Sequence, residues 1–359
     1  MREIKELIWQ EGEYSYPAAY GFVPSIRGYI HDEDNSDRDC MLVVPGGGYC
    51  MCTPHEGELV AEVFYKQGMN AFVLTYTTDI TMSVPLMKQP LEDISRAVRF
   101  IRKRAEEFNI NGKKLFISGF SAGAHVCGSL AVHYDDVADK DTEYAGISNK
   151  PDGVILAYPV ITTGEYTHIY SVQTLLGKEP SDEDLSYFSL EKNVTKDTPP
   201  CFIWQTVTDD LVPVENSYLM AEALRIHGVP FAHYVFPSGF HGLSYPSEKF
   251  FSFNAGGEYV LEQLEKAVAA VKAGNGINVS EQRKKELEEQ FPDILPEGQS
   301  QKNIEQPKGD AIQAGEDSKA EDGAGDVDQA VDMLPPLDMT WSEDIGLWPE
   351  LARVWMNRI

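Results

Sequence analysis

Six short apolar runs mark the first two-thirds of the chain, and amphipathic or polar stretches separate them. The runs have the length of buried β-strands and lie at residues 41–44, 71–76, 115–117, 153–158, 201–206 and 231–236. Residues 90–108 instead repeat apolar side chains every three or four positions, which predicts an amphipathic helix. Helices are also expected near 58–66 and from Pro213 to Gly228. This alternation predicts one α/β domain whose mostly parallel sheet is covered by helices on both faces.

The pattern is weaker at both ends of the chain. Residues 1–35 are punctuated by tyrosine and proline and suggest an N-terminal extension. Helical spacing returns at 260–271 and again at 345–359, with a strongly charged segment at 280–290. Residues 296–332 contain no Phe, Tyr or Trp and have ten acidic residues against three lysines. Such a segment buries too little apolar surface to order itself, so we expect it to be disordered.

The net charge and the cysteine content limit the classes of partner and the cellular locations that are expected. The formal net charge is −27, which argues against nucleic acid or anionic membranes as partners. No apolar run approaches the roughly 18 residues of a membrane span, and residues 1–16 lack the apolar core of a signal peptide. The five cysteines are odd in number and follow no disulfide framework. We therefore expect reduced thiols and a cytoplasmic location.

The candidate chemistry is centred on Ser121. An apolar run at 115–117 leads into Gly119-Phe120-Ser121-Ala122-Gly123, and a helix-compatible stretch follows. This is a G-x-S-x-G pattern at a strand-to-helix junction, where a tight turn requires flanking glycines and projects the serine Oγ above the sheet. The pattern alone occurs by chance in roughly one chain in ten of this size, and Ser121 could instead be an ordinary helix N-cap. Its meaning depends on partner residues elsewhere.

Partners of the required kinds follow two later strands. A serine nucleophile needs a base, a carboxylate that orients the base, and N–H donors for the oxyanion. Asp209 and Asp210 follow the strand at 201–206, and His241 follows the strand at 231–236. This is the chain order Ser, acid, His that a doubly wound hydrolase uses. One of the two aspartates could instead cap the helix that begins at Pro213.

Glycines after the first core strand supply candidate oxyanion donors. The segment Pro45-Gly46-Gly47-Gly48-Tyr49 follows the strand at 41–44, and glycine lets backbone N–H groups approach a substrate closely. The predicted donors are Gly47, Gly48 and Ala122, although a triple glycine is often only a turn. The predicted substrate contacts are Tyr49, beside this loop, and Phe240, beside His241.

Other reactive side chains receive structural interpretations. Cys50, Cys52 and His55 could form a metal cluster, but no fourth ligand is evident, so neither a metal nor another cofactor is expected. His125 is expected to pack behind the serine turn.

Taken together, these motifs resemble the α/β-hydrolase esterases, and among them the acetyl esterase and acetylxylan esterase-like carbohydrate deacetylases. The resemblance rests on PGGGY (45–49), HEGE (55–58), GFSAGAH (119–125), TDDLVPVENS (208–217) and GFHGL (239–243). It covers about residues 38–245 and returns at LWPELARVWM (347–356), which looks like the last helix of that family. It implies an α/β-hydrolase fold with Ser121 as nucleophile, His241 as base and Asp209, in preference to Asp210, as acid.

The resemblance also implies a domain organisation. About a hundred residues separate the histidine loop from the segment like the last helix, which is far more than usual in such a family. The acidic segment is therefore expected to be an insertion. The predicted division is a catalytic domain at 1–257, a helical and then acidic insertion at 258–340, and a C-terminal helix at 341–359 that completes the fold.

The expected activity is that of a cytoplasmic serine esterase that removes small acyl groups, above all acetyl, from sugars or oligosaccharides. The expected partner is a small-molecule ester or an acetylated oligosaccharide. A prolyl-oligopeptidase-like peptidase shares the serine turn and triad order, but the chain has no N-terminal region large enough for a propeller. The third alternative is a catalytically silent protein that recruits a basic partner through its acidic segment.

Overall fold

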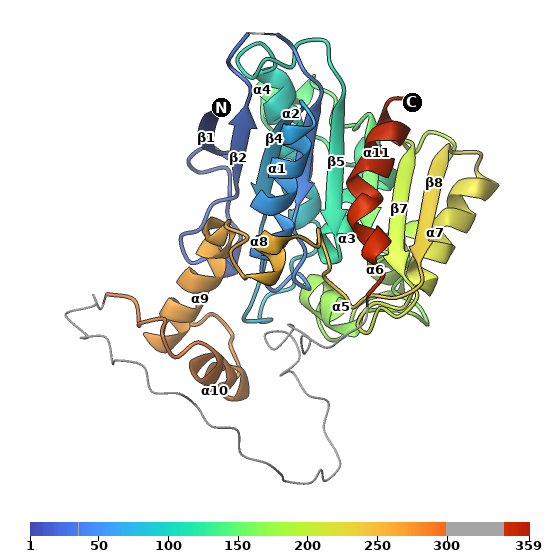
Figure 1. The fold of residues 1–359 in the computed structure, drawn as a ribbon. Coiled ribbons are helices and arrows are strands. Elements are labelled where there is room, and N and C mark those ends of the chain that lie inside the picture. The colour runs from blue at the N-terminus through green and yellow to red at the C-terminus, as the bar shows by residue number, and fades with distance from the viewer. Residues whose placement is uncertain (35, 299–340) are drawn as a thin grey trace.

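The computed structural model describes residues 1–34, 36–298 and 341–359, which form one eight-stranded sheet with helices on both faces (Figure 1). The strand order is β1-β2-β4-β3-β5-β6-β7-β8. The strands are β1 (Arg2–Leu7), β2 (Ser25–Ile30), β3 (Cys40–Val44), β4 (Asn70–Thr75), β5 (Leu115–Phe120), β6 (Gly153–Ala157), β7 (Cys201–Thr206) and β8 (Phe231–Phe236). From β4 to β8 every pairing is parallel, whereas β1 and β2 pair antiparallel. This is the expected α/β-hydrolase architecture.

The inner strands are apolar along their whole length because both of their faces are covered. Every residue of β3 to β7 is buried, as expected for parallel strands between two helical layers. In the pairing register, Gly119 at the end of β5 lies beside Val44 of β3 and Leu156 of β6. The carboxyl ends of these strands therefore meet at one edge of the sheet, and the loops that follow them can share a site.

The expectation of an N-terminal extension is wrong, because residues 1–35 contain two strands of the sheet. In β1, side chains alternate between half-buried and exposed positions, so only one of its faces contacts the protein. β2 pairs with β1 on one side and with β4 on the other. Between them lies the short 3-10 helix η1 (Pro17–Ala19).

Eleven α-helices lie within the described residues. They are α1 (Glu58–Lys66), α2 (Gln89–Lys103), α3 (Ala122–His133), α4 (Thr142–Ala145), α5 (Ile169–Leu176), α6 (Asp182–Tyr187), α7 (Glu215–Ile226), α8 (Glu248–Phe251), α9 (Glu262–Lys272), α10 (Glu281–Gln290) and α11 (Trp348–Met356). Further 3-10 helices are η2 (Pro54–Glu56), η3 (Tyr134–Asp136), η4 (Leu190–Lys192), η5 (Glu258–Leu261) and η7 (Glu343–Leu347). In the described part of the chain, none of these helices is long and apolar enough to cross a bilayer.

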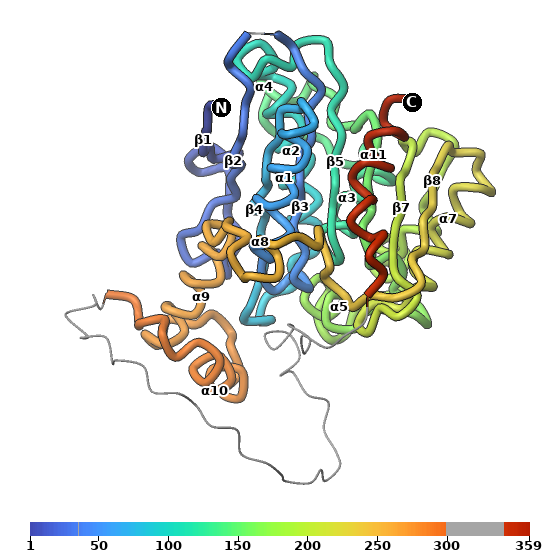
Figure 2. Tube along the Cα trace, in the orientation of Figure 1, coloured from blue at the N-terminus to red at the C-terminus, as the bar shows by residue number. Residues whose placement is uncertain are grey.

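The helix α11 packs on the middle of the sheet, although it is the last element of the chain (Figure 2). Trp348 is fully buried and stacks on Trp204 of β7 with ring centroids 5.5 Å apart. Its Nε1 donates a hydrogen bond of 2.7 Å to the carbonyl of Ser244, just after the predicted histidine loop. Trp355 packs against Phe116 of β5 and Phe202 of β7. The tryptophans of this segment therefore complete the hydrophobic core under the central strands.

The helices α9 and α10, which lie between the histidine loop and α11 in the chain, pack beside η1 and the loop after β4. Gln263 of α9 accepts from the N–H of Thr78 and donates to its carbonyl. Arg283 of α10 donates two hydrogen bonds to the carbonyl of Ile80. Most of the acidic segment, with its predicted disorder, lies outside the described residues. The boundaries at 257 and 340 stay predictions.

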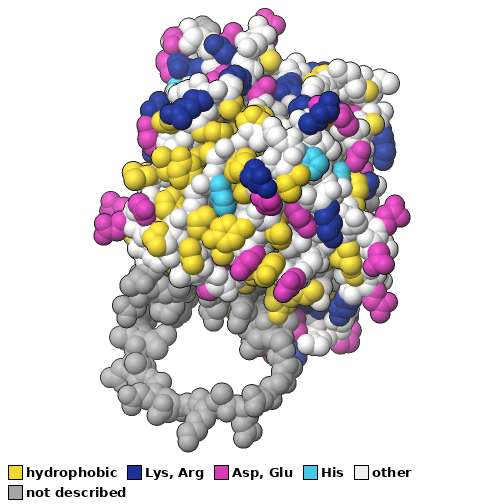
Figure 3. All heavy atoms as spheres, turned by 90° about the vertical axis from the view of Figure 1, so that its right-hand side faces the viewer, with side chains coloured by type: hydrophobic (Ala, Val, Ile, Leu, Met, Phe, Trp, Pro, Cys, Tyr) yellow, Lys and Arg dark blue, Asp and Glu magenta, His cyan; other side chains and the backbone are white. Residues whose placement is uncertain are grey.

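The strand order ends with β8, which forms the outer edge of the sheet opposite β1. Its side chains are mostly half-buried, and Tyr234 is 37% exposed. The surface on this side mixes apolar side chains with acidic and basic ones (Figure 3).

Candidate active site

Ser121 occupies a strained turn between β5 and α3. Its backbone angles are φ 52° and ψ −119°, a combination that a residue with a side chain adopts only at a cost. A Cβ added at Gly119 would lie 2.2 Å from the carbonyl oxygen of Gly123, and one at Gly123 would lie 2.2 Å from that of Val44. Both glycines are therefore required by the close approach of the backbone, as the sequence pattern predicts.

The side chain of Ser121 points at His241. Its Oγ lies 2.8 Å from His241 Nε2, and His241 Nδ1 lies 2.9 Å from Asp209 Oδ2 and 3.0 Å from Oδ1. Because an ionised carboxylate only accepts hydrogen bonds, Nδ1 carries the proton. Nε2 is then an acceptor and accepts a hydrogen bond from the hydroxyl of Ser121. The structure brings together the three side chains that the sequence analysis selected.

The two adjacent aspartates take different positions around His241. Asp209 faces the imidazole, and its Oδ1 also accepts from the N–H groups of Leu211 and Val212 at 3.1 and 2.8 Å. Asp210 accepts from the backbone N–H of His241 at 2.9 Å, whereas the ring nitrogen Nδ1 contacts Asp209. Asp209 thus holds the imidazole ring of His241, while Asp210 holds the backbone of the loop that carries it.

The surroundings of His241 favour its protonated form. Burial is the largest single influence and lowers the pKa of His241. The charge and hydrogen bond of Asp209, joined by the charges of Glu56 and Asp210, outweigh burial and raise the pKa above its ordinary value. The ring also packs edge-on against Tyr158, with centroids 4.9 Å apart. A histidine in this setting can accept a proton from a serine and hold it.

The glycine loop after β3 borders the same serine. A Cβ at Gly46 would lie 2.5 Å from the carbonyl oxygen of Phe120 and 2.8 Å from Ser121 Cβ. Gly47 and Gly48 have φ of 112° and 61°, both in the region that favours glycine. The N–H of Gly46 donates to Glu56 at 2.7 Å. The predicted oxyanion donors Gly47 and Gly48 are therefore the next N–H groups along this loop.

Tyr49 and Phe240, the predicted substrate contacts, are both buried. Tyr49 is 2% exposed, and its hydroxyl lies 2.7 Å from His125 Nδ1. Phe240 is 8% exposed and packs against Phe250 with ring centroids 6.5 Å apart. Their burial favours a packing role, and contact with substrate stays a prediction. His125 lies behind the serine turn as expected, and burial lowers its pKa to about 4.

Three residues near the site were not singled out from the sequence for any role. Glu56 of η2 and Tyr158, which follows β6, are buried and hydrogen-bonded to each other at 2.7 Å. His168 borders the glycine loop, because a Cβ at Gly48 would lie 4.0 Å from its Cε1. Burial, followed by the charge of His241, lowers the pKa of His168 to about 4. Only Glu56 had a sequence signal, since it belongs to the HEGE motif.

The cysteines near this loop have ordinary packing partners. Cys50 Sγ lies 3.4 Å from Thr174 Oγ1, and Cys52 Sγ lies 4.0 Å from the carbonyl of Tyr76. Burial raises the pKa of both thiols. In the ranges that the structure describes, no three His, Cys, Asp or Glu side chains form a group that could hold a metal ion.

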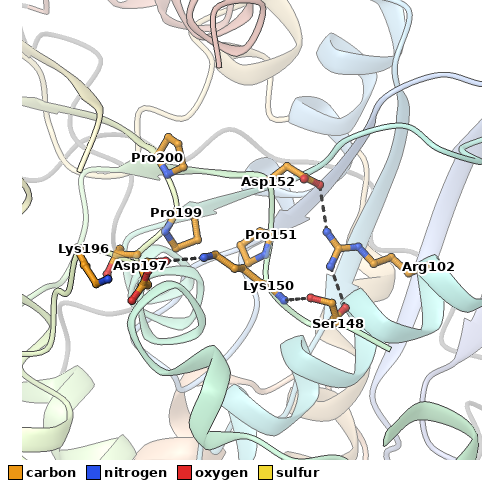
Figure 4. A pocket seen from close by; sticks show the side chains of 10 residues that line it. Arg102, Ser148, Lys150, Pro151, Asp152, Lys196, Asp197, Pro199 and Pro200 are labelled. Atoms are coloured by element: carbon orange, nitrogen blue, oxygen red, sulfur yellow. Dashed lines mark hydrogen bonds and ion pairs between the residues drawn. The ribbon is translucent and has the colours of Figure 1, made fainter. Parts of the chain in front are cut away.

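A separate surface pocket lies at the other edge of the sheet, where β6 and β7 begin (Figure 4). Its charged groups are largely paired within the protein. Arg102 bonds to Asp152 and to the carbonyl of Ser148, and Lys150 donates to the carbonyl of Asp197. The loops with Ser121, Asp209 and His241 follow the opposite ends of the strands, so this pocket is not part of the candidate active site.

Comparison with known proteins gives a consistent set of relatives. A family model described as BD-FAE matches residues 29–224. Endo-1,4-beta-xylanase B of Butyrivibrio fibrisolvens is 68% identical over 271 residues, which are 76% of this chain and 42% of that protein. Acetylxylan esterase of Xylanibacter ruminicola is 31% identical over 221 residues, which are 59% of this chain and 42% of that protein. The chain thus spans less than half the length of either relative.

Solved structures share the fold. The acetyl ester-xyloside bifunctional hydrolase from Caldicellulosiruptor lactoaceticus superposes with a TM-score of 0.63 at 33% identity, covering 76% of this chain and 97% of that one. The carboxylesterase Cest-2923 from Lactobacillus plantarum has a TM-score of 0.56 at 24% identity, covering 68% and 86%. The latter likeness concerns the fold alone.

Proposed function

Because the chain belongs to the BD-FAE family of α/β hydrolases, we propose that it is a serine carboxylic-ester hydrolase that removes small acyl groups, above all acetyl, from sugars or oligosaccharides. The observation that carries this proposal is the continuous hydrogen-bonded series from Ser121 through His241 to Asp209. The names of two relatives, an acetylxylan esterase and an acetyl ester-xyloside hydrolase, support the choice of acetylated carbohydrate.

The first half of the reaction forms an acyl-enzyme. Ser121 Oγ attacks the ester carbonyl carbon while its proton passes to His241 Nε2. Asp209 stabilises the resulting imidazolium through Nδ1 and keeps the ring in the required tautomer. When the tetrahedral intermediate collapses, the bond to the alkoxy oxygen breaks and His241 gives its proton to the departing alcohol.

The second half regenerates the enzyme. Water attacks the acyl carbon while its proton passes to His241 Nε2, and collapse of the second intermediate releases the carboxylic acid and returns the proton to Ser121 Oγ. In both halves the negative oxygen is held by backbone N–H groups of Gly47 or Gly48 and of Ala122. One such donor contributes about 3–4 kcal/mol to the transition state. No step needs a metal or an organic cofactor.

A hydrolysis panel tests this proposal. We expect the wild-type chain to cleave p-nitrophenyl acetate faster than the octanoate and to release acetate from acetylated xylo-oligosaccharides. It should release no reducing sugar from the same oligosaccharides once they are deacetylated. This control matters because one relative is named a xylanase, and glycoside cleavage instead uses a pair of carboxylates across the bond. Reducing ends without free acetate would contradict an esterase.

A fluorophosphonate separates this proposal from the alternative of a catalytically silent binding protein. Folded wild-type chain should form one adduct, on Ser121, and Ser121→Ala should form none. Absence of the wild-type adduct would favour the silent protein. A peptidase of the prolyl-oligopeptidase type would also be labelled, but it would cleave a prolyl amide substrate, which we expect to remain intact.

We further infer a cytoplasmic location and no nucleic-acid or membrane partner. All five cysteines are free and buried, which fits a reducing compartment. The strongly negative net charge fits neutral or cationic small molecules better than polyanions.

A further inference from the structure

Glu56 is a buried carboxylate that the proposed reaction does not use directly. It is 2% exposed, and a carboxylate is rarely buried unless a partner compensates its charge. Among the described residues, no lysine or arginine forms an ion pair with it, whereas the surface glutamate Glu62 pairs with Lys66 and Lys249. Only hydrogen-bond donors therefore stabilise Glu56, and their identity indicates what it holds in place.

Each carboxylate oxygen of Glu56 accepts one strong hydrogen bond from a different wall of the active site. Oε2 accepts from the backbone N–H of Gly46 at 2.7 Å. Oε1 accepts from the hydroxyl of Tyr158, also at 2.7 Å. Hydrogen bonds to an ionised acceptor are about twice as strong as neutral ones. One side chain thus links the glycine loop after β3 to the residue that follows β6.

Both ends of this link touch the reacting groups. A Cβ at Gly46 would lie 2.9 Å from Glu56 Oε2 and 2.8 Å from Ser121 Cβ, so the carboxylate and the serine both lie close to Gly46. At the other end, the ring of Tyr158 packs edge-on against His241. Tyr158 itself has a φ of 35°, which is unfavourable for a non-glycine residue and needs external support.

We propose that Glu56 is a positioning residue of the hydrolase reaction, which fixes the oxyanion loop through Gly46 and the imidazole of His241 through Tyr158. This proposal rests on the proposed function and adds a residue to it. Gly47 and Gly48 follow directly after Gly46, so a loop anchored at Gly46 presents its N–H groups in one place. Preorganised donors of this kind are effective because they need no reorganisation during the reaction.

Glu56 also acts on His241 through its charge. Among the described residues, the charged and titratable groups around His241 are Asp209, Asp210 and Glu56, which raise its pKa, the phenol of Tyr158, and the histidines His55 and His168. Burial lowers the pKa of both neighbouring histidines, so they are neutral near pH 7. Loss of the Glu56 charge should therefore lower the pKa of His241 and move the acid limb of kcat/KM to lower pH.

The test compares Glu56→Gln with Glu62→Gln, the same change at an exposed ion pair of α1. Glutamine retains one acceptor but places an NH₂ group against the second donor, and it removes the charge. We expect Glu56→Gln to lower kcat on p-nitrophenyl acetate by about 10–100-fold, with rates counted per active site titrated by fluorophosphonate. Its acid limb should shift by roughly half a pH unit or more toward acid. Glu62→Gln should change neither quantity.

A second variant separates position from charge. Glu56→Asp keeps the charge but is one methylene too short to hold both donors, so kcat should fall while the acid limb stays. If Glu56→Gln does not fold, the kcat of Glu56→Asp still tests the proposal. The proposal would be overturned if Glu56→Gln kept the wild-type kcat and the wild-type acid limb of kcat/KM. It would also be overturned if Glu56→Asp kept the wild-type kcat. If the wild-type chain hydrolysed no ester at all, the proposed function would fail first.

Discussion

At the scale of single residues, the site depends on which of two neighbouring aspartates meets the imidazole. The side chain of Asp209 is almost fully buried and accepts from the ring nitrogen, whereas that of Asp210 accepts from the backbone N–H of His241. In the proposed reaction, a carboxylate in the first position stabilises the charge that His241 gains in the transition state. One in the second position stabilises only the loop. The two residues should therefore differ sharply when their charge is removed.

We predict that Asp209→Asn lowers kcat by about 10⁴-fold, because asparagine favours the wrong tautomer of His241. Asp210→Asn keeps an oxygen that can accept from the backbone of His241, and kcat should fall by less than about tenfold. Steady-state kinetics on p-nitrophenyl acetate measure both, with thermal unfolding as a check of the fold. Equal losses would mean that the acid is shared, and a reversed order would assign it to Asp210.

The buried His125 should make the free energy of unfolding depend on pH in the acidic range. Its folded pKa of about 4 lies below its value of about 6.5 in an unfolded chain. Between these values the unfolded chain binds a proton that the folded chain does not. The stabilising contribution is complete above pH 6.5 and is lost as the pH falls toward 4. The unfolding free energy should fall by up to about 1.4 kcal/mol per pH unit for this one group.

Denaturant titrations between pH 4 and 7 check this prediction. His125→Gln should flatten the pH dependence of the unfolding free energy, whatever its effect on stability at pH 7. His227→Gln should leave the slope as it is, because the His227 side chain is exposed at the end of α7. An unchanged slope in His125→Gln would show that other groups, such as the buried His168, account for the acid sensitivity.

At the scale of elements, the glycine loop shows how one motif meets different physical demands at successive positions. Gly47 combines a φ of 112° with close contact, since a Cβ there would lie 2.4 Å from the carbonyl oxygen of Met51. Gly48 has a φ of 61° but open space, because its nearest neighbours, His168 and Ser171, are 4.0 Å away. A side chain at Gly47 must displace the backbone, whereas one at Gly48 only strains it.

We therefore predict that Gly47→Ala lowers kcat at least tenfold more than Gly48→Ala. The second change costs about 1–2 kcal/mol for the left-handed conformation but leaves the loop in place. The measurements are kcat per titrated active site and the Tm of each variant. A Gly48→Ala variant that loses as much activity as Gly47→Ala would mean that the backbone freedom of Gly48 is itself needed for the reaction.

The elements that could be predicted from the sequence are those whose burial imposes a simple pattern. The five inner strands are buried on both faces, so their apolar runs matched the observed strands to within a few residues. β1 was missed because it is half-buried, and Arg2, Lys5 and Glu6 leave it too charged to read as a core strand. In β2, Arg27 and Gly28 interrupt a run that is otherwise buried on both sides.

The site residues that could be predicted from the sequence are those in loops that follow predicted strands. Ser121 comes directly after β5, and Asp209 and His241 lie in the loops that follow β7 and β8. Parallel strands bring these loops to one edge of the sheet. No role was predicted for Glu56, because an acidic residue beside the start of a helix usually faces solvent. Its partners, the N–H of Gly46 and the hydroxyl of Tyr158, are visible only in three dimensions: one is backbone and the other lies 102 residues away.

At the scale of the whole molecule, stability depends on a segment far from the catalytic motifs in sequence. We predict that deletion of 341–359 leaves an aggregated or inactive protein, because it uncovers the faces of β5 and β7 that Trp348 and Trp355 contact. Replacing one buried tryptophan by alanine commonly costs about 3–5 kcal/mol, a large share of a typical net stability. Solubility, Tm and esterase activity measure the effect.

The matched control shortens the acidic segment instead. Replacing 299–340 by about 20 Gly and Ser residues halves the length of the connection, which changes the loop-closure free energy by only about 0.6 kcal/mol. This variant should keep its Tm and its turnover. A truncated chain that retained both properties would show that α11 is dispensable, and a loss of activity in the shortened chain would give the acidic segment a role in the reaction.

Because α11 is the last element of the chain, it can cover the sheet only some time after the sheet strands have been synthesised. Trp204 leaves the ribosome with β7, but its stacking partner Trp348 is translated about 140 residues later. At roughly 5–20 residues per second, the aromatic face of the nascent sheet stays uncovered for about 7–30 seconds. Contacts between residues far apart in sequence slow folding on average, so we expect apolar surface of the sheet to stay exposed during this interval. Its yield in cells should therefore depend on chaperones that bind nascent chains until Trp348 and Trp355 emerge.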